Sequence, residues 1–242
     1  KAAGLKAEEF RSDSLPAGST GYDGRCVMYV SSEEIEVFST TGKLSINEKT
    51  KHYITKNTGA TTPESYKLSV NEYVMLVDSS HPQVGTVLGR YDGQHIVRLY
   101  GYGANERKPV YGVSPRNVGQ RFALDALLTP AEEAPLVILK GPAGTAKTFL
   151  SMAAALAQTV DRWEGGNRYR KILLTRPNTK MDDDIGYLKG DEVQKVMPAL
   201  RGLTDNVDNL MPHQDKGTGK SKVEISALDS LMSQGIIDAQ AM

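Results

Sequence analysis

The fold of this chain is constrained most by an eight-residue turn between an apolar run and an alanine-rich segment. The turn reads Gly141-Pro142-Ala143-Gly144-Thr145-Ala146-Lys147-Thr148. The run before it, 136–139, is continuously apolar, which predicts a strand buried on both faces of a parallel sheet. The segment after it has helical periodicity from Lys147 to Val160. Strand, turn and helix in this order predict a doubly wound α/β domain with a parallel sheet.

The turn fits the phosphate-binding pattern G-x-x-x-x-G-K-[ST] at all but one position. Backbone N–H groups of such a turn face inward and the helix N-terminus adds partial positive charge, so the turn favours phosphate oxygens. We therefore expect Gly141–Phe149 to bind ATP, with Lys147 at the β- and γ-phosphates and Thr148 at Mg²⁺. The exception is Ala146, where the pattern has glycine. Its methyl group is harmless only if φ there is already helical, and a purely structural turn is the alternative interpretation.

Three residues outside the turn are further candidates for binding nucleotide or RNA. Asp238 ends an apolar run, 235–238, that we expect to be a strand, and a carboxylate there is placed to hold Mg²⁺. Gln120 begins a predicted helix, and its amide can donate to and accept from an adenine edge together. Arg176 follows a predicted strand, 171–175, at the edge of the sheet where ligands bind in open α/β folds. For each residue the alternative is an ordinary surface side chain.

Residues 21–113 have a different pattern, in which short β-rich runs alternate with turns. Asp92-Gly93 lies between two such runs and predicts a hairpin. We expect a small antiparallel β module, barrel-like or sandwich-like, whose tyrosines either pack on the sheet or form a base-stacking platform. The predicted division of the chain is a linker at 1–20, this module at 21–113 and the α/β domain at 114–242.

Composition limits the classes of function that are open to the chain. Its 29 basic and 29 acidic residues balance, so nucleic acid must be contacted through a local patch. The single cysteine, Cys26, excludes an internal disulfide and favours a reducing cytoplasm. No apolar run reaches the roughly 20 residues that cross a bilayer, so we expect no membrane partner. Because the chain lacks an initiator Met and ends just after 235–238, we expect it to be part of a longer protein.

Several long motifs give the chain a family resemblance. In order and spacing, the following segments resemble the PhoH-like ATPase domain: 115–128, 141–145, 175–177, 184–191 and 205–210. The resemblance implies a RecA-like core and an enzyme that hydrolyses ATP with Mg²⁺ and works on RNA. It also implies that Gln120 reads adenine, that Gly141–Thr148 holds the triphosphate and that Asp238 belongs to the second magnesium motif.

The resemblance extends upstream to fusion proteins of the family. Residues 1–10 resemble the end of a PIN nuclease domain, and the β-rich region resembles the connector of PIN–PhoH fusions. This implies an RNA helicase-like motor with a PIN ribonuclease in the same polypeptide, single-stranded RNA as partner and a hexameric ring. Two departures stand out: Ala146, and Ala239 where the family has an acid after Asp238. They keep a second hypothesis open, a nucleotide-gated RNA-binding or ring-assembly module with little hydrolysis.

Overall fold

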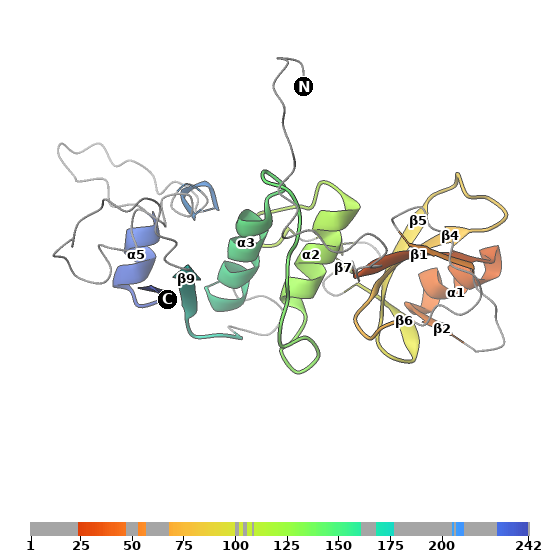
Figure 1. The fold of residues 1–242 in the computed structure, drawn as a ribbon, viewed down its shortest axis with the longest axis horizontal. Coiled ribbons are helices and arrows are strands. Elements are labelled where there is room, and N and C mark those ends of the chain that lie inside the picture. Colours follow the sequence, from red (N-terminus) through yellow and green to blue (C-terminus); the bar gives the residue numbers. More distant parts are fainter. Residues whose placement is uncertain are drawn as a thin grey trace, which may run out of the picture. The chain divides into compact units, whose positions relative to one another are not determined.

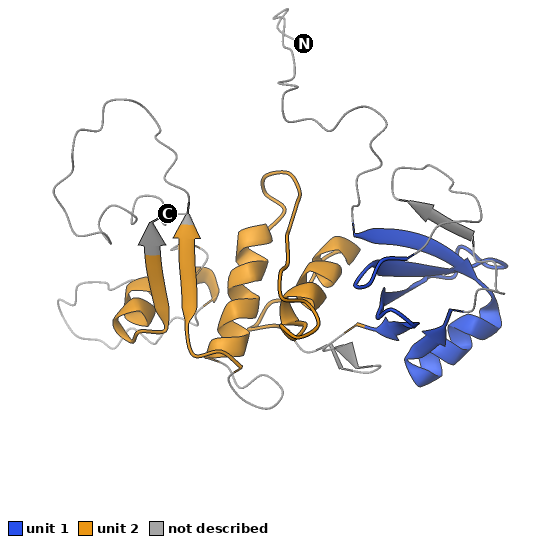
Figure 2. Cartoon of the chain, turned by 60° about the horizontal axis from the view of Figure 1, so that its bottom comes forward, with its two compact units in different colours: residues 1–98 blue, residues 99–242 orange. Residues whose placement is uncertain are grey.

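The computed structural model describes residues 24–46, 53–56, 68–99, 102–103, 106–107, 109–160, 168–176, 205, 207–210 and 227–241. The chain forms two compact units, 1–98 and 99–242 (Figure 2). No helix within the described ranges is long and apolar enough to cross a membrane. The predicted linker at 1–20 and the family motif at 184–191 lie outside the described residues.

Unit 1 is built on one six-stranded sheet with the order β2-β6-β5-β4-β1-β3 (Figure 1). Its strands are β1 (Arg25–Val30), β2 (Lys43–Ser45), β3 (Tyr53–Lys56), β4 (Tyr73–Asp78), β5 (Thr86–Tyr91) and β6 (His95–Arg98). The β5–β6 pairing confirms the hairpin predicted at Asp92-Gly93. The prediction of a wholly antiparallel module is wrong at one pairing, because β1 and β4 run parallel. The long connection that carries α1, β2 and β3 supplies the crossover that a parallel pair requires.

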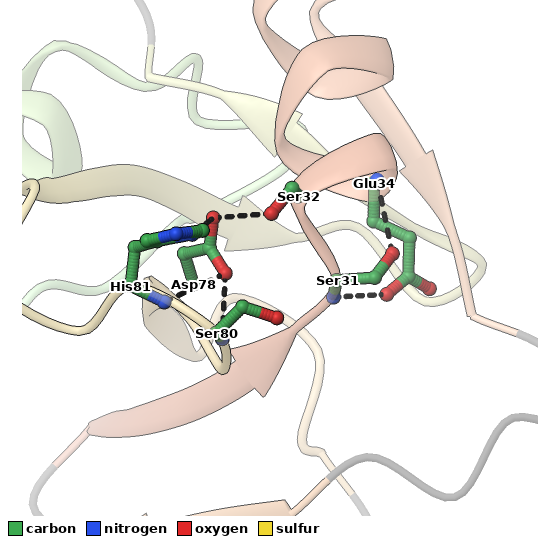
Figure 3. Close-up of polar contacts among 6 residues, drawn as sticks. All are labelled: Ser31, Ser32, Glu34, Asp78, Ser80 and His81. Atoms are coloured by element: carbon green, nitrogen blue, oxygen red, sulfur yellow. Dashed lines mark hydrogen bonds and ion pairs between the residues drawn. The ribbon is translucent and has the colours of Figure 1, made fainter.

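The helix α1 (Ser32–Thr41) follows β1 and is not predicted by hydrophobic periodicity, because Phe38 is its one buried residue. A local signal for it does exist in the capping box at its start. The Ser31 N–H donates to Glu34 Oε2 at 2.8 Å, and the Glu34 N–H donates to Ser31 Oγ at 3.2 Å (Figure 3). Phe38 packs into the core of the sheet with the alternate residues of the strands, among them Cys26, Met28, Val30, Val74, Leu76 and Ile96.

Unit 2 has the α/β composition that the sequence predicts. Its elements are β7 (Tyr102–Gly103), β8 (Glu106–Arg107), α2 (Val118–Leu128), α3 (Lys147–Thr159), β9 (Ile172–Arg176), α5 (Ala227–Ser233) and β10 (Ile237–Ala241). β9 and β10 pair in parallel, and α2 packs against α3 (Figure 1). The predicted helix after the turn and the predicted strand at 171–175 are both confirmed to within one residue.

One strand prediction in unit 2 is wrong, and another is confirmed with shifted bounds. Residues 136–139 form no strand, and Leu136 and Ile138 are 77% and 80% exposed. Among the described strands of unit 2, β9 pairs with β10 and neither pairs with this run. The predicted strand at 235–238 begins later, at Ile237, and continues to Ala241. Gly235 instead closes α5 with φ of 71°, a left-handed turn in which the Gly235 N–H donates to Met232 O.

The compact units divide after Arg98, whereas the predicted boundary lies after Val113. An isolated bridge joins Val110 and Val113, and Val110 is buried against Leu124, Leu128 and other residues of α2 and α3. These residues belong to unit 2 because they complete the apolar face of its helix pair.

Candidate nucleotide-binding site

The turn at 141–148, which is predicted to bind phosphate, leads directly into α3, which begins at Lys147. The first hydrogen bond of the helix runs from Leu150 N–H to Ala146 O at 2.9 Å. The N–H groups of Lys147, Thr148 and Phe149 therefore lie at the positive end of the helix, before its hydrogen-bond ladder begins. The Phe149 side chain packs against the apolar core of unit 2, so its backbone N–H is the group suited to phosphate.

The Lys147 side chain folds back into the turn. Its Nζ donates to Gly141 O at 2.8 Å, to Pro142 O at 2.7 Å and to Thr145 Oγ1 at 3.2 Å. The Thr145 hydroxyl also donates to Pro142 O at 2.9 Å. The ammonium thus sits among oxygen acceptors inside the turn. Phosphate oxygens that enter the turn meet a positioned cation and can replace these acceptors.

Ala146 adopts the backbone conformation for which glycine is preferred. Its φ is 64° and its ψ is 22°, in the left-handed region, and Gly144 has a φ of 77°. The condition under which the methyl group would be harmless is therefore not met. A left-handed alanine costs about 1 kcal/mol relative to glycine. The departure from the motif thus stores backbone strain at the first residue before the helix.

Asp238 lies near the start of β10, opposite Leu173 of β9. Its Oδ2 accepts from Lys171 Nζ at 2.8 Å, an ion pair between partly exposed side chains. Thr148, the other predicted magnesium ligand, is exposed at the first turn of α3. Among the described residues no group of three His, Cys, Asp or Glu side chains is arranged to hold a metal. The roles of Thr148 and Asp238 as magnesium ligands therefore stay predictions.

Gln120 lies in the first turn of α2, where Asn117 caps the helix through its side chain. The Gln120 N–H donates to Asn117 Oδ1 at 2.9 Å, and Gln120 Oε1 accepts from Arg116 N–H at 2.9 Å. The half-buried amide thus orders the entry to α2. Arg176 ends β9 at its carboxyl end, opposite Ala241, and its side chain lies outside the described part of the structure. Adenine reading by Gln120 and RNA contact by Arg176 both stay predictions.

The sequence profile of the PhoH-like protein family matches residues 112–239, which hold the turn, both helices and the parallel strands. The chain belongs to the PhoH-like protein family. The family is of the ATPase type. Its members include Protein PhoH2 of Bacillus subtilis, which is 31% identical over 98% of this chain and 50% of the relative. Protein PhoH2 of Mycolicibacterium smegmatis is 26% identical over 98% of this chain and 44% of the relative.

A third relative, a PhoH-like protein of Bacillus subtilis, is 32% identical over 51% of this chain and 37% of its own length. The chain thus spans about half the length, or less, of these relatives. No solved structure matches the chain. The predicted PhoH-like resemblance and mixed α/β class are confirmed by the family match.

One of the PhoH-like motifs has a structural role that the sequence did not reveal. Asp208, in the motif at 205–210, accepts from the Ala227 N–H at 2.9 Å and so caps the start of α5. Val207 and Leu210 of the same motif are buried in the core of unit 2. This part of the family signature therefore stabilises the element that leads into β10.

A cavity of about 210 Å³ opens beside α3, and it is not at the phosphate-binding turn. It is lined by Leu127, Ser151, Ala154, Ala155, Gln158, Thr159, Tyr169, Lys171 and Ile172. These residues come from the end of α2, from α3, from the segment before β9 and from the first residue of β9. A cation, a helix terminus and a PhoH-like motif coincide at the turn, so the turn stays the predicted nucleotide site. The lining of the cavity is mostly apolar and includes no residue of the turn 141–148.

Proposed function

We propose that this PhoH-like chain binds ATP with Mg²⁺ at Gly141–Thr148 and hydrolyses the bond to the γ-phosphate. The observation that carries the proposal is the position of Lys147, whose ammonium lies inside the turn at the positive end of α3. In this site Lys147 neutralises the charge that develops on the β- and γ-phosphate oxygens. The bound Mg²⁺ would supply further charge neutralisation, held by the Thr148 hydroxyl and Asp238.

In the proposed reaction a water oxygen attacks the γ-phosphorus, and the bond from that phosphorus to the β,γ-bridging oxygen breaks, giving ADP and phosphate. The ion pair between Asp238 Oδ2 and Lys171 competes with metal binding at that oxygen. The described residues provide no acid next to Asp238 to orient the water, because Ala239 is buried and apolar. We propose that this group, and an arginine that stabilises the transferred charge, come from elsewhere in the longer protein or from a neighbouring subunit of a ring.

We further propose that hydrolysis drives the remodelling of single-stranded RNA for a PIN nuclease domain in the same cytoplasmic polypeptide. The family resemblance of residues 1–10 and of the β-rich unit supports this assignment. The test measures ATP turnover by the full-length protein with and without single-stranded RNA, beside Lys147→Ala. RNA-stimulated turnover that disappears in the variant is the expected result. Turnover that RNA does not change rules out the RNA motor.

A second candidate is a nucleotide-gated RNA-binding or ring-assembly module with little hydrolysis. The left-handed Ala146 favours it, because strain next to Lys147 can hold the turn away from the geometry of the transition state. In that case Mg·ATP binds tightly, RNA binding or assembly depends on ATP, and turnover is negligible. Restoration of turnover by Ala146→Gly would identify the strained residue as the cause.

A further inference from the structure

The carboxyl ends of α2 and α3 are joined by two polar side chains, Gln158 and Arg168, which we call the helix junction. Gln158 is only 5% exposed. Its Nε2 donates to Leu127 O, in the last turn of α2, at 3.0 Å and to Ala154 O, in its own helix, at 3.1 Å. A buried amide that holds a carbonyl of another helix fixes the distance between the two helices at this point.

Arg168 completes the helix junction from the segment before β9. Its Nη1 donates to Leu128 O at 2.7 Å and to Gln158 Oε1 at 3.0 Å. The N–H groups of Arg168 and Tyr169 donate to Gln158 O at 2.9 and 3.1 Å. Leu128 O belongs to the last turn of α2, whose carbonyls have no N–H within their own helix. The guanidinium cation therefore also lies at the negative end of α2.

A cavity of about 210 Å³ opens next to the helix junction, with Leu127, Gln158 and Tyr169 in its lining. The same ends of the two helices also pack through buried apolar side chains, Leu128 of α2 with Ala154 and Ala157 of α3. The hydrogen bonds of Gln158 and Arg168 add directional contacts to this apolar packing.

The two helices that meet at the junction carry the two halves of the candidate nucleotide site at their other ends. Gln120 lies about 10 Å along α2 from Leu127, and Lys147 lies about 17 Å along α3 from Gln158, at 1.5 Å per residue. A change of about 10° in the tilt of α2 at the junction displaces Gln120 by about 2 Å. That displacement is enough to break hydrogen bonds to a base.

We propose that Gln158 and Arg168 are positioning residues that set the spacing between Gln120 and the phosphate-binding turn, and thereby the preference of the site for adenine. This inference rests on the proposed function, in which Lys147 holds the phosphates, and on the predicted role of Gln120 in reading the base. Neither junction residue touches the nucleotide in this arrangement. Their effect is therefore on the base and not on the triphosphate.

The test compares Gln158→Met with the unchanged full chain in equilibrium binding of Mg·ATP, Mg·GTP and magnesium tripolyphosphate. Met retains the length of the side chain and removes the amide. If the substitution displaces Gln120 and costs its hydrogen bond to the base, the affinity for ATP is expected to be about tenfold lower. The affinity for tripolyphosphate is expected to stay within about twofold of that of the unchanged chain. The preference for ATP over GTP is expected to fall together with the affinity for ATP. Gln234→Met is the matched control, because the amide of Gln234, just after α5, bonds only to Ser230 Oγ of that helix among the described contacts.

A second pair of variants keeps the inference testable if Gln158→Met does not fold. Arg168→Lys retains a cationic donor for Leu128 O and is expected to keep the preference for ATP, whereas Arg168→Met is expected to lose it. Three outcomes would overturn the inference. The first is an equal loss of affinity for ATP and for tripolyphosphate, and the second is an unchanged preference for ATP in Gln158→Met or Arg168→Met. The third is that the unchanged chain itself has no preference for a base. If the unchanged chain binds tripolyphosphate no better than Lys147→Ala does, the proposed function itself fails.

Discussion

The sheets of the two units differ in how fully their strands are paired. In unit 1, β4 has β1 on one edge and β5 on the other, and its Leu76 is completely buried. In unit 2, β9 and β10 pair with each other, and Leu173 of β9 is 63% exposed. The first sheet encloses its own core with α1, whereas the second leaves the side chain of Leu173 exposed.

The difference follows from how each kind of sheet is assembled. Neighbouring antiparallel strands are often joined by short turns, so the turn sequence Asp92-Gly93 predicts that β5 and β6 pair. Parallel strands are joined by long crossovers, and their neighbours come from distant parts of a chain. The apolar composition of a run such as 136–139 therefore favours a buried strand. It does not specify which other strand would pair with it.

The largest expected effect is the difference between an apolar residue of β4 in unit 1 and an apolar residue of the run 136–139 in unit 2. Leu76→Ala opens a cavity in the core of unit 1 and should lower the free energy of unfolding by about 3 kcal/mol. Ile138→Ala removes an exposed side chain and should lower it by less than about 0.5 kcal/mol. Urea denaturation of both variants measures the contrast. A loss of several kcal/mol in Ile138→Ala would show that the run at 136–139 is buried and that the contrast between the units is wrong.

A close approach inside unit 1 should produce the next largest effect. A Cβ at Gly89 would clash with Ile96 Cγ2 and would lie 3.0 Å from Val97 O. Gly89→Ala is therefore expected to destabilise the chain by about 2 kcal/mol through overpacking. Thr86→Val, on the exposed start of the same strand, serves as the control. Because the strain is confined to unit 1, binding of Mg·ATP at low temperature should be unchanged, and loss of binding would reveal coupling between the units.

In unit 2, relief of the left-handed alanine should have a smaller effect of opposite sign. Ala146→Gly is expected to raise the free energy of unfolding by about 1 kcal/mol, because glycine has no Cβ penalty at a φ of 64°. Gly144→Ala, at a φ of 77°, is the reverse control and should lower it by a similar amount. Thermal unfolding without nucleotide measures both. Destabilisation by Ala146→Gly would mean that the Ala146 methyl contacts outweigh the strain.

The smallest expected effect concerns pH and the start of α1 in unit 1. A hydrogen bond from Ser32 Oγ, together with N–H donors of Ser80 and His81, holds the pKa of Asp78 below its ordinary value of 3.8 (Figure 3). A lowered folded-state pKa contributes stability that is present above the unfolded-state value and is lost as the pH falls through the folded-state value. Asp78→Asn should therefore unfold at a lower temperature than the unchanged chain at pH 6. The gap should close below pH 3.8, and a gap independent of pH would contradict this account.

The local features of both units were predictable from sequence, because their causes are local. The helix after the turn, the hairpin at Asp92-Gly93 and the Lys147–Thr148 position all follow from short motifs. The helix α1 was missed since its capping box is the main signal and its buried face is a single phenylalanine. The helix junction was missed because Gln158 and Arg168 acquire their role through carbonyls of a different helix. No periodicity in the sequence reports such a contact.

The central claim, that the turn at Gly141–Thr148 is a triphosphate site, is tested most directly by the equilibrium binding of Mg·ATP to the full chain and to Lys147→Ala. Removal of a charge that contacts the phosphates in such a site is expected to weaken binding by about 100-fold or more. Arg116→Ala, on the exposed lead into α2, controls for the general loss of a cation. Binding that is unaffected by Lys147→Ala would contradict the account, and binding abolished by Lys147→Ala alone would establish the site.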